Sequence, residues 1–468
     1  MRPNFFLDIA MGAYSFSRDP KVVPMVSTAH RSIQTAIPAP GTKKILERLE
    51  LCESRSMHGQ LPLVWDRAED YSVFDTAGNR WIDFTSTIFV ANVGHSNAHV
   101  TAAMKAALDK PLYSCYAYAN ESRARYLERL IKFAGAPFEK AFLLTAGTEA
   151  TEGALKLMRM HGQKQGKKRR GVICIEGNWH GRTLGAQMMS SNLAQRDWIG
   201  YQDTDIHHIP FPYPWALQGY TPEAFLQLGL DTLKARGIDI AQDVCGFMLE
   251  TFQGWGAVFY PVEFVKAIEI VCRRNGILLA FDEMQSGFGR TGKAFGFQHY
   301  GVIPDLICCG KGMGGGVPLS GVLGRASIMD LPDVGNMSST HSANPLVCAA
   351  GIAVIEELEG RSLIAETARK GELLFGALER IQSRFPKHIS HLLGRGLIAS
   401  VLFKHPETCA ADGPFASRVA ELCMQKGLLV VHTGRESIKI GPPLTIADDA
   451  LLEGLEVLAE AIEETAAQ

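Results

Sequence analysis

The sequence has few cysteines, no long apolar run and no excess of charge of either sign. Its ten cysteines in 468 residues are too sparse for a disulfide scaffold, and none forms a CxxC pair. No stretch approaches the roughly 20 apolar residues of a membrane span. The 47 basic and 49 acidic residues leave a net charge of -2, so no nucleic-acid partner is expected. These absences exclude a disulfide-rich secreted fold, a membrane protein and a basic nucleic-acid-binding domain.

The N-terminal sequence MRPNFFLDIAMGAYSF lacks the apolar core of a signal peptide, because Asp8 interrupts it. Cys308 and Cys348 stand inside apolar runs, which predicts buried, reduced thiols. We therefore expect a cytoplasmic protein. The 46% of hydrophobic and 21% of charged residues are typical of an ordinary globular chain.

The length and the pattern predict two or three domains. Residues 1–60 are interpreted as an irregular arm with short helices. Residues 61–86 predict a hairpin with its turn at 75–79, and residues 99–110 have helical apolar spacing. We place the N-terminal arm and hairpin in residues 1–95, packed with the small domain. A large domain is predicted for 96–345 and a C-terminal small domain for 346–468.

Short apolar runs alternate with helical segments between about 140 and 325. The runs are AFLLT (141–145), GVICIEG (171–177), CGFMLE (245–250), GILLAFDE (276–283) and DLICCG (305–310). Strands that are apolar throughout and alternate with helices predict an α/β fold with a mostly parallel central sheet and flanking helices. The C-terminal part mixes long helices with strand-like pieces, which predicts a smaller α+β domain.

Ligands of an open parallel sheet bind beyond the carboxyl ends of its strands. Lys311 stands between glycines after one run, where a desolvated amine could form a Schiff base with a carbonyl. A solvated loop lysine fits the same context. Asp282 ends another run and needs a partner, which could be a helix end, Arg290 or a protonated pyridine nitrogen. Gln285 could reach the same ligand.

Two further polar clusters follow strands of the predicted sheet. Gly147 and Thr148 open a helix, whose free N–H groups attract an anion, although Thr148 could simply cap that helix. Trp179 could stack on a flat ring, and Arg182 could grip a carboxylate. An interface tryptophan and a surface arginine are the alternatives.

Pyridoxal 5′-phosphate fits these four features together. They are a lysine and an acid at strand ends, a helix N-terminus that can bind phosphate, and an aromatic side chain that can stack on the ring. A phosphorylated sugar or a nucleotide is the rival ligand. No group of His, Asp and Glu residues has a convincing metal spacing, so no metal is predicted.

The stretch AFDEMQSGFGRTGKAFGFQHYGVIPDLICCGKGMGGGVPLSGVLG (280–324) resembles the signature of the class III (ω-type) aminotransferases, which are fold-type I pyridoxal-phosphate enzymes. The segments LLTAGTEATEGALKL, GNWHGRT, LETFQG and SSTHSANPLVCAAG also match, so that the resemblance runs from about 60 to 460. It implies a transaminase with small-molecule amine and keto or aldehyde substrates. It further implies a homodimer with active sites at the subunit interface, with a tetramer left open.

The resemblance implies a role for each matching residue of the cofactor site. Lys311 would form the Schiff base with the cofactor and carry the proton. Asp282 would pair with the pyridine nitrogen, and Gln285 would lie near the phenolic oxygen. Gly147 and Thr148 would hold the phosphate in the large domain.

Five more residues are predicted on the same basis. Trp179 would stack on the ring, and Thr340 would reach the phosphate bound in the neighbouring subunit. Glu250, in LETFQG, is placed with the cofactor-binding residues. Arg182 would grip a substrate carboxylate, and Ile88 is added as a substrate residue.

Two departures from the resemblance bear on the substrate. Members that use glutamate often carry an acid where this chain has Trp255, and an arginine where it has Lys439. Lysine cannot give the bidentate fork of arginine. We therefore expect an amine at a terminal or non-α carbon, such as an ω-amino acid, a simple amine or an amino sugar. The alternative is that Lys439 still binds a carboxylate in a changed geometry.

Two other functions stay open from the sequence. A racemase, an aminomutase or a decarboxylase could share this fold, and some decarboxylating relatives carry a tryptophan at the position of Trp179. A non-catalytic protein that binds a phosphorylated ligand is the third hypothesis, but the retention of Lys311, Asp282 and Thr148 argues against it.

Overall fold

The computed structural model describes residues 14–468 and divides into two units. One unit is Phe89–Arg369, and the other joins the chain up to Ile88 with Lys370–Gln468. The second unit therefore combines segments from both ends of the sequence. The predicted domains 1–95, 96–345 and 346–468 stay a prediction, because a unit of this kind is not by itself an independently folding domain.

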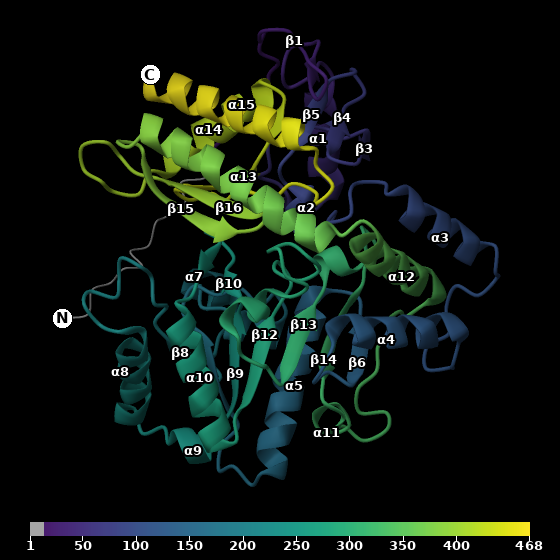
Figure 1. The fold of residues 1–468 in the computed structure, drawn as a ribbon, viewed down its shortest axis with the longest axis vertical. Helices are drawn as coiled ribbons and strands as arrows, with labels where there is room; N and C mark the ends of the chain where they lie inside the picture. Colours follow the sequence, from purple (N-terminus) through teal and green to yellow (C-terminus); the bar gives the residue numbers. More distant parts are fainter. Residues whose placement is uncertain (1–13) are drawn as a thin grey trace. The chain divides into compact units, whose positions relative to one another are not determined.

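One seven-stranded sheet forms the centre of the unit Phe89–Arg369 (Figure 1). Strand β14 is antiparallel to both of its neighbours, and the other six strands run in one direction. The five predicted apolar runs all form strands of this sheet, so the mostly parallel α/β sheet is confirmed. In spatial order the strands are β6 (Lys140–Leu144), β14 (Ser320–Gly324), β13 (Leu306–Cys309), β12 (Leu278–Asp282), β9 (Val244–Glu250), β7 (Gly171–Ile175) and β8 (Ile206–Ile209).

Helices cover both faces of this sheet. Met248, Ala280 and Cys308 point to the face covered by α5 and belong to one buried cluster with it. Because side chains alternate along a strand, their neighbours in the chain point to the other face, where α10 packs on β12. The helices of this unit are α3 (Ala98–Leu108), α4 (Glu121–Ala134), α5 (Gly147–Lys164), α6 (Leu184–Met189), α7 (Leu193–Arg196), α8 (Pro222–Ala235), α9 (Ile240–Asp243), α10 (Val262–Asn275), α11 (Ala326–Met329) and α12 (Pro345–Gly360).

A glycine allows α5 to lie close to the sheet. A Cβ at Gly246 of β9 would overlap the side chain of Met158 on α5. The missing side chain therefore lets α5 approach the strands, and its N-terminus lies beside their carboxyl ends.

The other unit holds two smaller sheets. In one, the spatial order is β1 (Val26–Ser27), β2 (Ser32–Ile33), β5 (Arg80–Asp83), β4 (Ser72–Phe74) and β3 (Arg67–Glu69), and β17 (Leu428–Leu429) pairs with β5. In the other, the order is β15 (Ile389–Arg395), β16 (Ile398–Phe403), β19 (Ser437–Ile440) and β18 (Val431–His432). The helices are α1 (Thr42–Cys52), α14 (Gly413–Gln425) and α15 (Asp448–Ala466). The helix α13 (Leu363–Arg384) crosses a unit boundary, and so does the short segment α2 (Ser86–Phe89), whose four residues have a positive φ.

The N-terminal and C-terminal segments share a core within this unit. Trp81 of β5 is fully buried, and its Nε1 donates to the carbonyl of Met424 on α14 at 2.7 Å. Ile33 and Leu429 belong to the same buried cluster. This core explains why a strand from near the C-terminus pairs with strands formed near the N-terminus.

Most local elements agree with the sequence. The predicted hairpin consists of β4 and β5, and Asp75 Oδ1 accepts from the N–H groups of Ala77 and Asn79 in its turn. The helix predicted for 99–110 is α3. The arm contains the eleven-residue helix α1 and two short strands, and its first 13 residues lie outside the described residues. The short strands β8 and β14 were not predicted.

All ten cysteines are free, and seven of them are buried. Cys308 and Cys348 are among the buried ones, as their apolar surroundings predicted. Within residues 14–468, no helix combines the length and the apolar character needed to cross a membrane.

Candidate active site

Three adjacent parallel strands bring Glu250, Asp282 and Lys311 to one edge of the central sheet. Asp282, the last residue of β12, pairs in register with Glu250, the last residue of β9. On the other side Asp282 pairs with Cys308 of β13. Lys311 follows the end of β13 by two residues. The predicted meeting of these side chains at the carboxyl ends of the strands thus follows from the parallel register.

Lys311 lies between Gly310 and Gly312 with a left-handed backbone, at a φ of 45°. Part of the residue remains accessible, but burial of the ammonium group lowers the pKa of Lys311. The negative charges of Asp282 and Glu250 oppose this effect and raise the pKa. The structure therefore holds an amine that loses its proton more easily than an exposed lysine.

Asp282 is paired with a histidine. His180 Nδ1 lies 3.0 Å from Asp282 Oδ2, and the histidine side chain is fully buried. The other carboxylate oxygen, Oδ1, accepts from the N–H of Met284 at 3.0 Å. Arg290, the partner considered from the sequence, donates its Nη2 to Asn92 Oδ1 at 2.7 Å.

Glu250 connects three segments of the site. Its Oε2 accepts from the N–H groups of Trp179 at 3.0 Å and Gly254 at 3.3 Å. Its Oε1 lies 3.5 Å from Gln285 Nε2. Glu250 is almost fully buried, so the carboxylate fixes the loops after β7, β9 and β12 relative to one another.

The N-terminus of α5 contributes Gly147 and Thr148. The helix begins at Gly147 and its N-cap residue is Ala146, so the alternative in which Thr148 caps the helix is wrong. The Thr148 hydroxyl lies 2.6 Å from the hydroxyl of Thr183 and accepts from the Thr183 N–H at 3.3 Å. This is the N-terminus of an 18-residue helix, and the free N–H groups of its first turn favour the binding of an anion.

Trp179 and Arg182 lie together after β7. The Trp179 side chain is 37% exposed, and the guanidinium carbon of Arg182 lies 4.5 Å from the centre of its ring. This is the distance of a cation–π contact. The tryptophan, whose backbone N–H is bound to Glu250, therefore keeps an accessible aromatic surface with the arginine against it.

Three further predicted residues are Lys439, Ile88 and Thr340. Lys439 is a buried residue of β19, and Ile88 is a 42% exposed residue of α2. Both belong to the unit that joins the two ends of the chain, so their predicted contact with the substrate stays a prediction. Thr340 is exposed in the segment before α12, and its predicted role across a subunit interface also stays a prediction.

Sequence reasoning assigned no role to four side chains that the structure places at the site. His180 stands next to Trp179, and its position inside GNWHGRT was the available signal. Thr183 lies in the same segment. Tyr213 and Gln253 contact Trp255, and only the aromatic character of FPYPW (211–215) hinted at the first of them.

The residues fit the pyridoxal phosphate expected from the sequence. Asp282 can pair with a protonated ring nitrogen, and Lys311 offers an amine with a lowered pKa. The N-terminus of α5 is closely packed against the segment after β12, since a Cβ at Gly147 would come within 2.7 Å of Met284 Sδ. His180 Nε2 is buried without a hydrogen-bond partner among the described residues, so the ring next to Asp282 keeps an unused polar atom.

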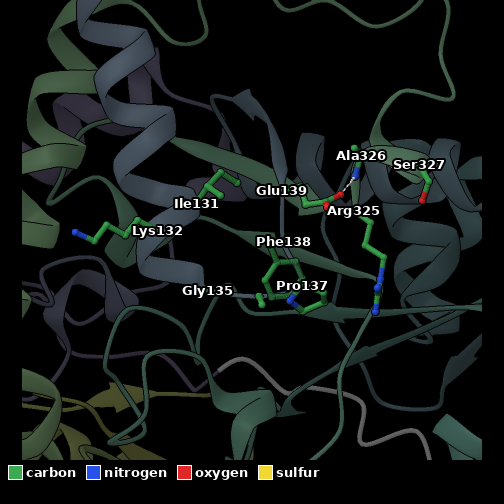
Figure 2. A pocket seen from close by; sticks show the side chains of 10 residues that line it. Ile131, Lys132, Gly135, Pro137, Phe138, Glu139, Arg325, Ala326 and Ser327 are labelled. Atoms are coloured by element: carbon green, nitrogen blue, oxygen red, sulfur yellow. Dashed lines mark hydrogen bonds between the residues drawn. The ribbon is translucent and has the colours of Figure 1, made fainter.

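A hollow lies elsewhere in the same unit, and none of the predicted site residues lines it. It is an open depression of about 750 Å³ lined by Lys132, Phe138, Glu139 and Arg325, among others (Figure 2). Glu139 accepts there from the N–H of Ala326 at 2.7 Å.

Across residues 14–468, no three His, Cys, Asp or Glu side chains are grouped as metal ligands.

Comparison with known proteins gives the same family as the sequence motifs. The family model described as "Aminotransferase class-III" matches residues 54–462. A 2-aminoadipate transaminase of Pseudomonas putida is 33% identical over 413 residues, which cover 86% of this chain and 96% of that protein. A 4-aminobutyrate aminotransferase of Mycobacterium leprae is 30% identical over 445 residues, which cover 92% and 97%.

A crystal structure of an aminotransferase from Bacillus anthracis has a similar fold. Its TM-score is 0.82 at 25% identity, and the match covers 90% of this chain and 98% of that one. The likeness extends over both units, since each is included in a match of this coverage.

We predict that Glu250→Ala and Glu250→Gln have different effects. Glu250→Ala takes the acceptor from the buried N–H of Gly254 and from the partly buried N–H of Trp179, at a total cost of about 1–3 kcal/mol in the free energy of unfolding. Glu250→Gln keeps an acceptor oxygen and loses only the charge. Both variants remove a charge that raises the pKa of Lys311, so Lys311 should become reactive at lower pH. Urea unfolding and the pH dependence of Lys311 acetylation, followed by mass spectrometry, measure the two effects.

Glu223→Gln is the matched control, because it removes the same charge from an exposed position on α8. This variant should change neither the free energy of unfolding nor the pH dependence of Lys311 acetylation. The interpretation of Glu250 is wrong if Glu250→Gln destabilises the protein as much as Glu250→Ala, or if the midpoint of Lys311 acetylation does not move.

Proposed function

This chain belongs to the class III aminotransferases, and we propose that it takes its amino group from a donor whose amine is on a terminal or other non-α carbon. As a member of that family it is a pyridoxal-phosphate-dependent transaminase, which transfers an amino group from an amine to a carbonyl acceptor. The donor class and the roles of individual residues are our proposal.

In this proposal Lys311 is the acid and base of the reaction. Its lowered pKa lets the neutral amine take a proton from the substrate carbon that bears nitrogen. The same group returns the proton when the amino group is transferred. Pyridoxal phosphate, when bound, supplies the electron sink that stabilises the charge left on that carbon.

The other site residues hold and orient the cofactor. Asp282, itself fixed by His180 and by the N–H of Met284, keeps a ring nitrogen protonated. Gly147 and Thr148 bind the phosphate at the N-terminus of α5, and Gln285 lies at the phenolic oxygen. Trp179 covers one face of the ring.

The presence of Trp255 is the main observation that supports a donor with a terminal or other non-α amine. Resembling members that use glutamate have an acid at this position. An indole there has no negative charge to pair with a substrate-binding arginine, and Lys439 stands where that arginine is expected. The 4-aminobutyrate relative supports a terminal amine, whereas the 2-aminoadipate relative is named for an α-amine. The residues at the site therefore decide our choice.

Thr340 supports a homodimer in which each subunit completes the phosphate site of the other. It is exposed in the segment before α12, where the resemblance places a residue that crosses the interface. A mass of one chain in light scattering would exclude this assembly. Ten unbridged cysteines support a reducing, cytoplasmic location.

We predict that terminal amines convert the holoenzyme faster than their α-isomers. The matched pair is 4-aminobutyrate and 2-aminobutyrate, which contain the same atoms and differ in the position of the amine. Glutamate, alanine, β-alanine, putrescine and an aminoglycoside complete the panel. The best terminal amine should react on the order of tenfold faster than any α-amino acid. The loss of the visible absorbance band of the cofactor measures each rate.

This donor assignment is wrong if glutamate or 2-aminobutyrate reacts as fast as every terminal amine. Release of carbon dioxide, or a change of handedness without loss of the band, would instead indicate a decarboxylase or a racemase.

We also predict that Lys311→Ala abolishes transfer and leaves the fold intact. Removal of the general base should lower the rate by about 10²–10⁴-fold or more. Amino transfer to an added keto acid and thermal unfolding measure the two properties. Lys293→Ala removes an exposed lysine from the same unit and serves as the control. Full turnover by Lys311→Ala would contradict the assignment.

A further inference from the structure

An aromatic segment beside the site has no role in the proposed chemistry. Residues 211–215 read F-P-Y-P-W, so that each pair of aromatic residues is separated by a proline. Proline fixes its own φ and restricts the residue before it. The ring centres of Phe211 and Tyr213 lie 4.6 Å apart, and those of Tyr213 and Trp215 lie 4.9 Å apart with an angle of 12° between the planes. The segment is therefore a stiff ladder of three rings.

Tyr213, in the middle of this ladder, shares a hydrogen-bond acceptor with Trp255. The Tyr213 hydroxyl donates to Gln253 Oε1, and Trp255 Nε1 donates to the same oxygen at 2.8 Å. Gln253 is fully buried, and its Nε2 donates to the carbonyl of Glu176. The amide of Gln253 is thus bonded at both ends. We call Tyr213 and Gln253 the indole clamp.

The indole clamp decides which surface Trp255 can offer. Nε1 is the only polar atom of an indole, and the clamp already binds it. Trp255 remains partly exposed, so the accessible part of its side chain is hydrocarbon. Its ring centre lies 6.3 Å from that of Tyr213, which supports it from one side.

Trp255 is linked to Glu250 of the site through the residue that precedes it. It forms the tip of the hairpin of β10 (Phe252–Gln253) and β11 (Val258–Phe259), directly after β9. The preceding residue, Gly254, donates its N–H to Glu250, the carboxylate that also accepts from Trp179. The charge of Glu250 acts in turn on Lys311. The backbone N–H of Trp179 and that of the residue before Trp255 therefore bind one carboxylate, whose charge acts on the reactive amine.

We propose that Trp255 is a fixed apolar wall of the donor site, positioned by Tyr213 and Gln253, and that it selects primary amines with an apolar chain over amines whose far end is a carboxylate. The inference rests on the proposed function and names its substrate class. Each methylene buried on the indole favours binding about fourfold. A carboxylate placed there is desolvated without a donor from Trp255, because its Nε1 is bound to Gln253.

The test compares hexylamine with 6-aminohexanoate as donors for the holoenzyme. Both have a terminal amine on a six-carbon chain, and only the far end differs. We expect kcat/KM of the wild-type enzyme for hexylamine to exceed that for 6-aminohexanoate by about tenfold or more. Trp255→Ala should reduce this ratio of kcat/KM values about tenfold, because KM for hexylamine rises. Trp255→Phe should retain most of the ratio.

The indole clamp is tested by Gln253→Leu and Tyr213→Phe. Gln253→Leu frees the indole, so KM for hexylamine should rise several-fold while kcat stays within about twofold. Tyr213→Phe keeps the ring and leaves Gln253 in place, so its effect should be smaller and in the same direction. Circular dichroism checks the fold of each variant. If Gln253→Leu does not fold, Gln253→Met replaces it, because methionine has the length of glutamine and lacks the amide oxygen that accepts from Trp255.

Trp198→Phe is the control, because Trp198 is 64% exposed and its Nε1 donates to Gln187. Equal kcat/KM for the two donors, or an unchanged ratio in Trp255→Ala, would overturn the apolar wall and leave the terminal-amine proposal standing. If neither donor reacts while glutamate does, the proposed function itself is wrong. A change in kcat rather than KM in both clamp variants would show that the clamp supports the fold and not the donor site.

Discussion

The parallel register of β9, β12 and β13 is the constraint on which the whole site depends. It aligns Glu250 with Asp282 across two neighbouring strands and puts Lys311 just beyond the end of the third. The apolar strands supply the low-dielectric base that lowers the pKa of Lys311, and the two carboxylates limit this shift. An amine that is desolvated but still close to negative charge can both release and accept a proton. A shift of one strand by a single residue would break this balance.

Two consecutive carboxylates at the end of β12 serve different purposes. Asp282 faces His180, at the edge where Glu250 and Lys311 lie. Glu283 is buried and accepts from the Thr251 and Ser286 hydroxyls and from the N–H groups of Gly296 and Phe297. Burial raises the pKa of Glu283, although these four donors favour its charged form. One acid thus lies at the candidate site, where we propose that it takes part in the chemistry, and the other holds the following loop in place.

In our proposal, specificity depends on side chains that are themselves held by other groups of the protein. Trp179 owes its backbone position to Glu250, and Trp255 owes its orientation to Gln253. A tryptophan that donates to a buried, fully bonded amide cannot turn its polar atom to a substrate. The surface it offers is therefore fixed before any substrate arrives, which reduces the entropy lost on binding.

The sequence by itself determined the family, the parallel strands and the residues that follow them. Lys311, Asp282, Gly147 and Thr148 were identified because each stands at a boundary between local patterns, and because parallel strands must end at one edge. Only the tertiary structure decided which groups hold them. His180 meets Asp282 across 102 residues of chain, Trp179 meets Glu250 across 71, and Tyr213 meets Trp255 across 42. The insertion of β14 between β6 and β13 is likewise invisible in its short sequence. Such contacts have no period and no fixed spacing, because they depend on how distant segments pack and not on the conformation of either segment alone.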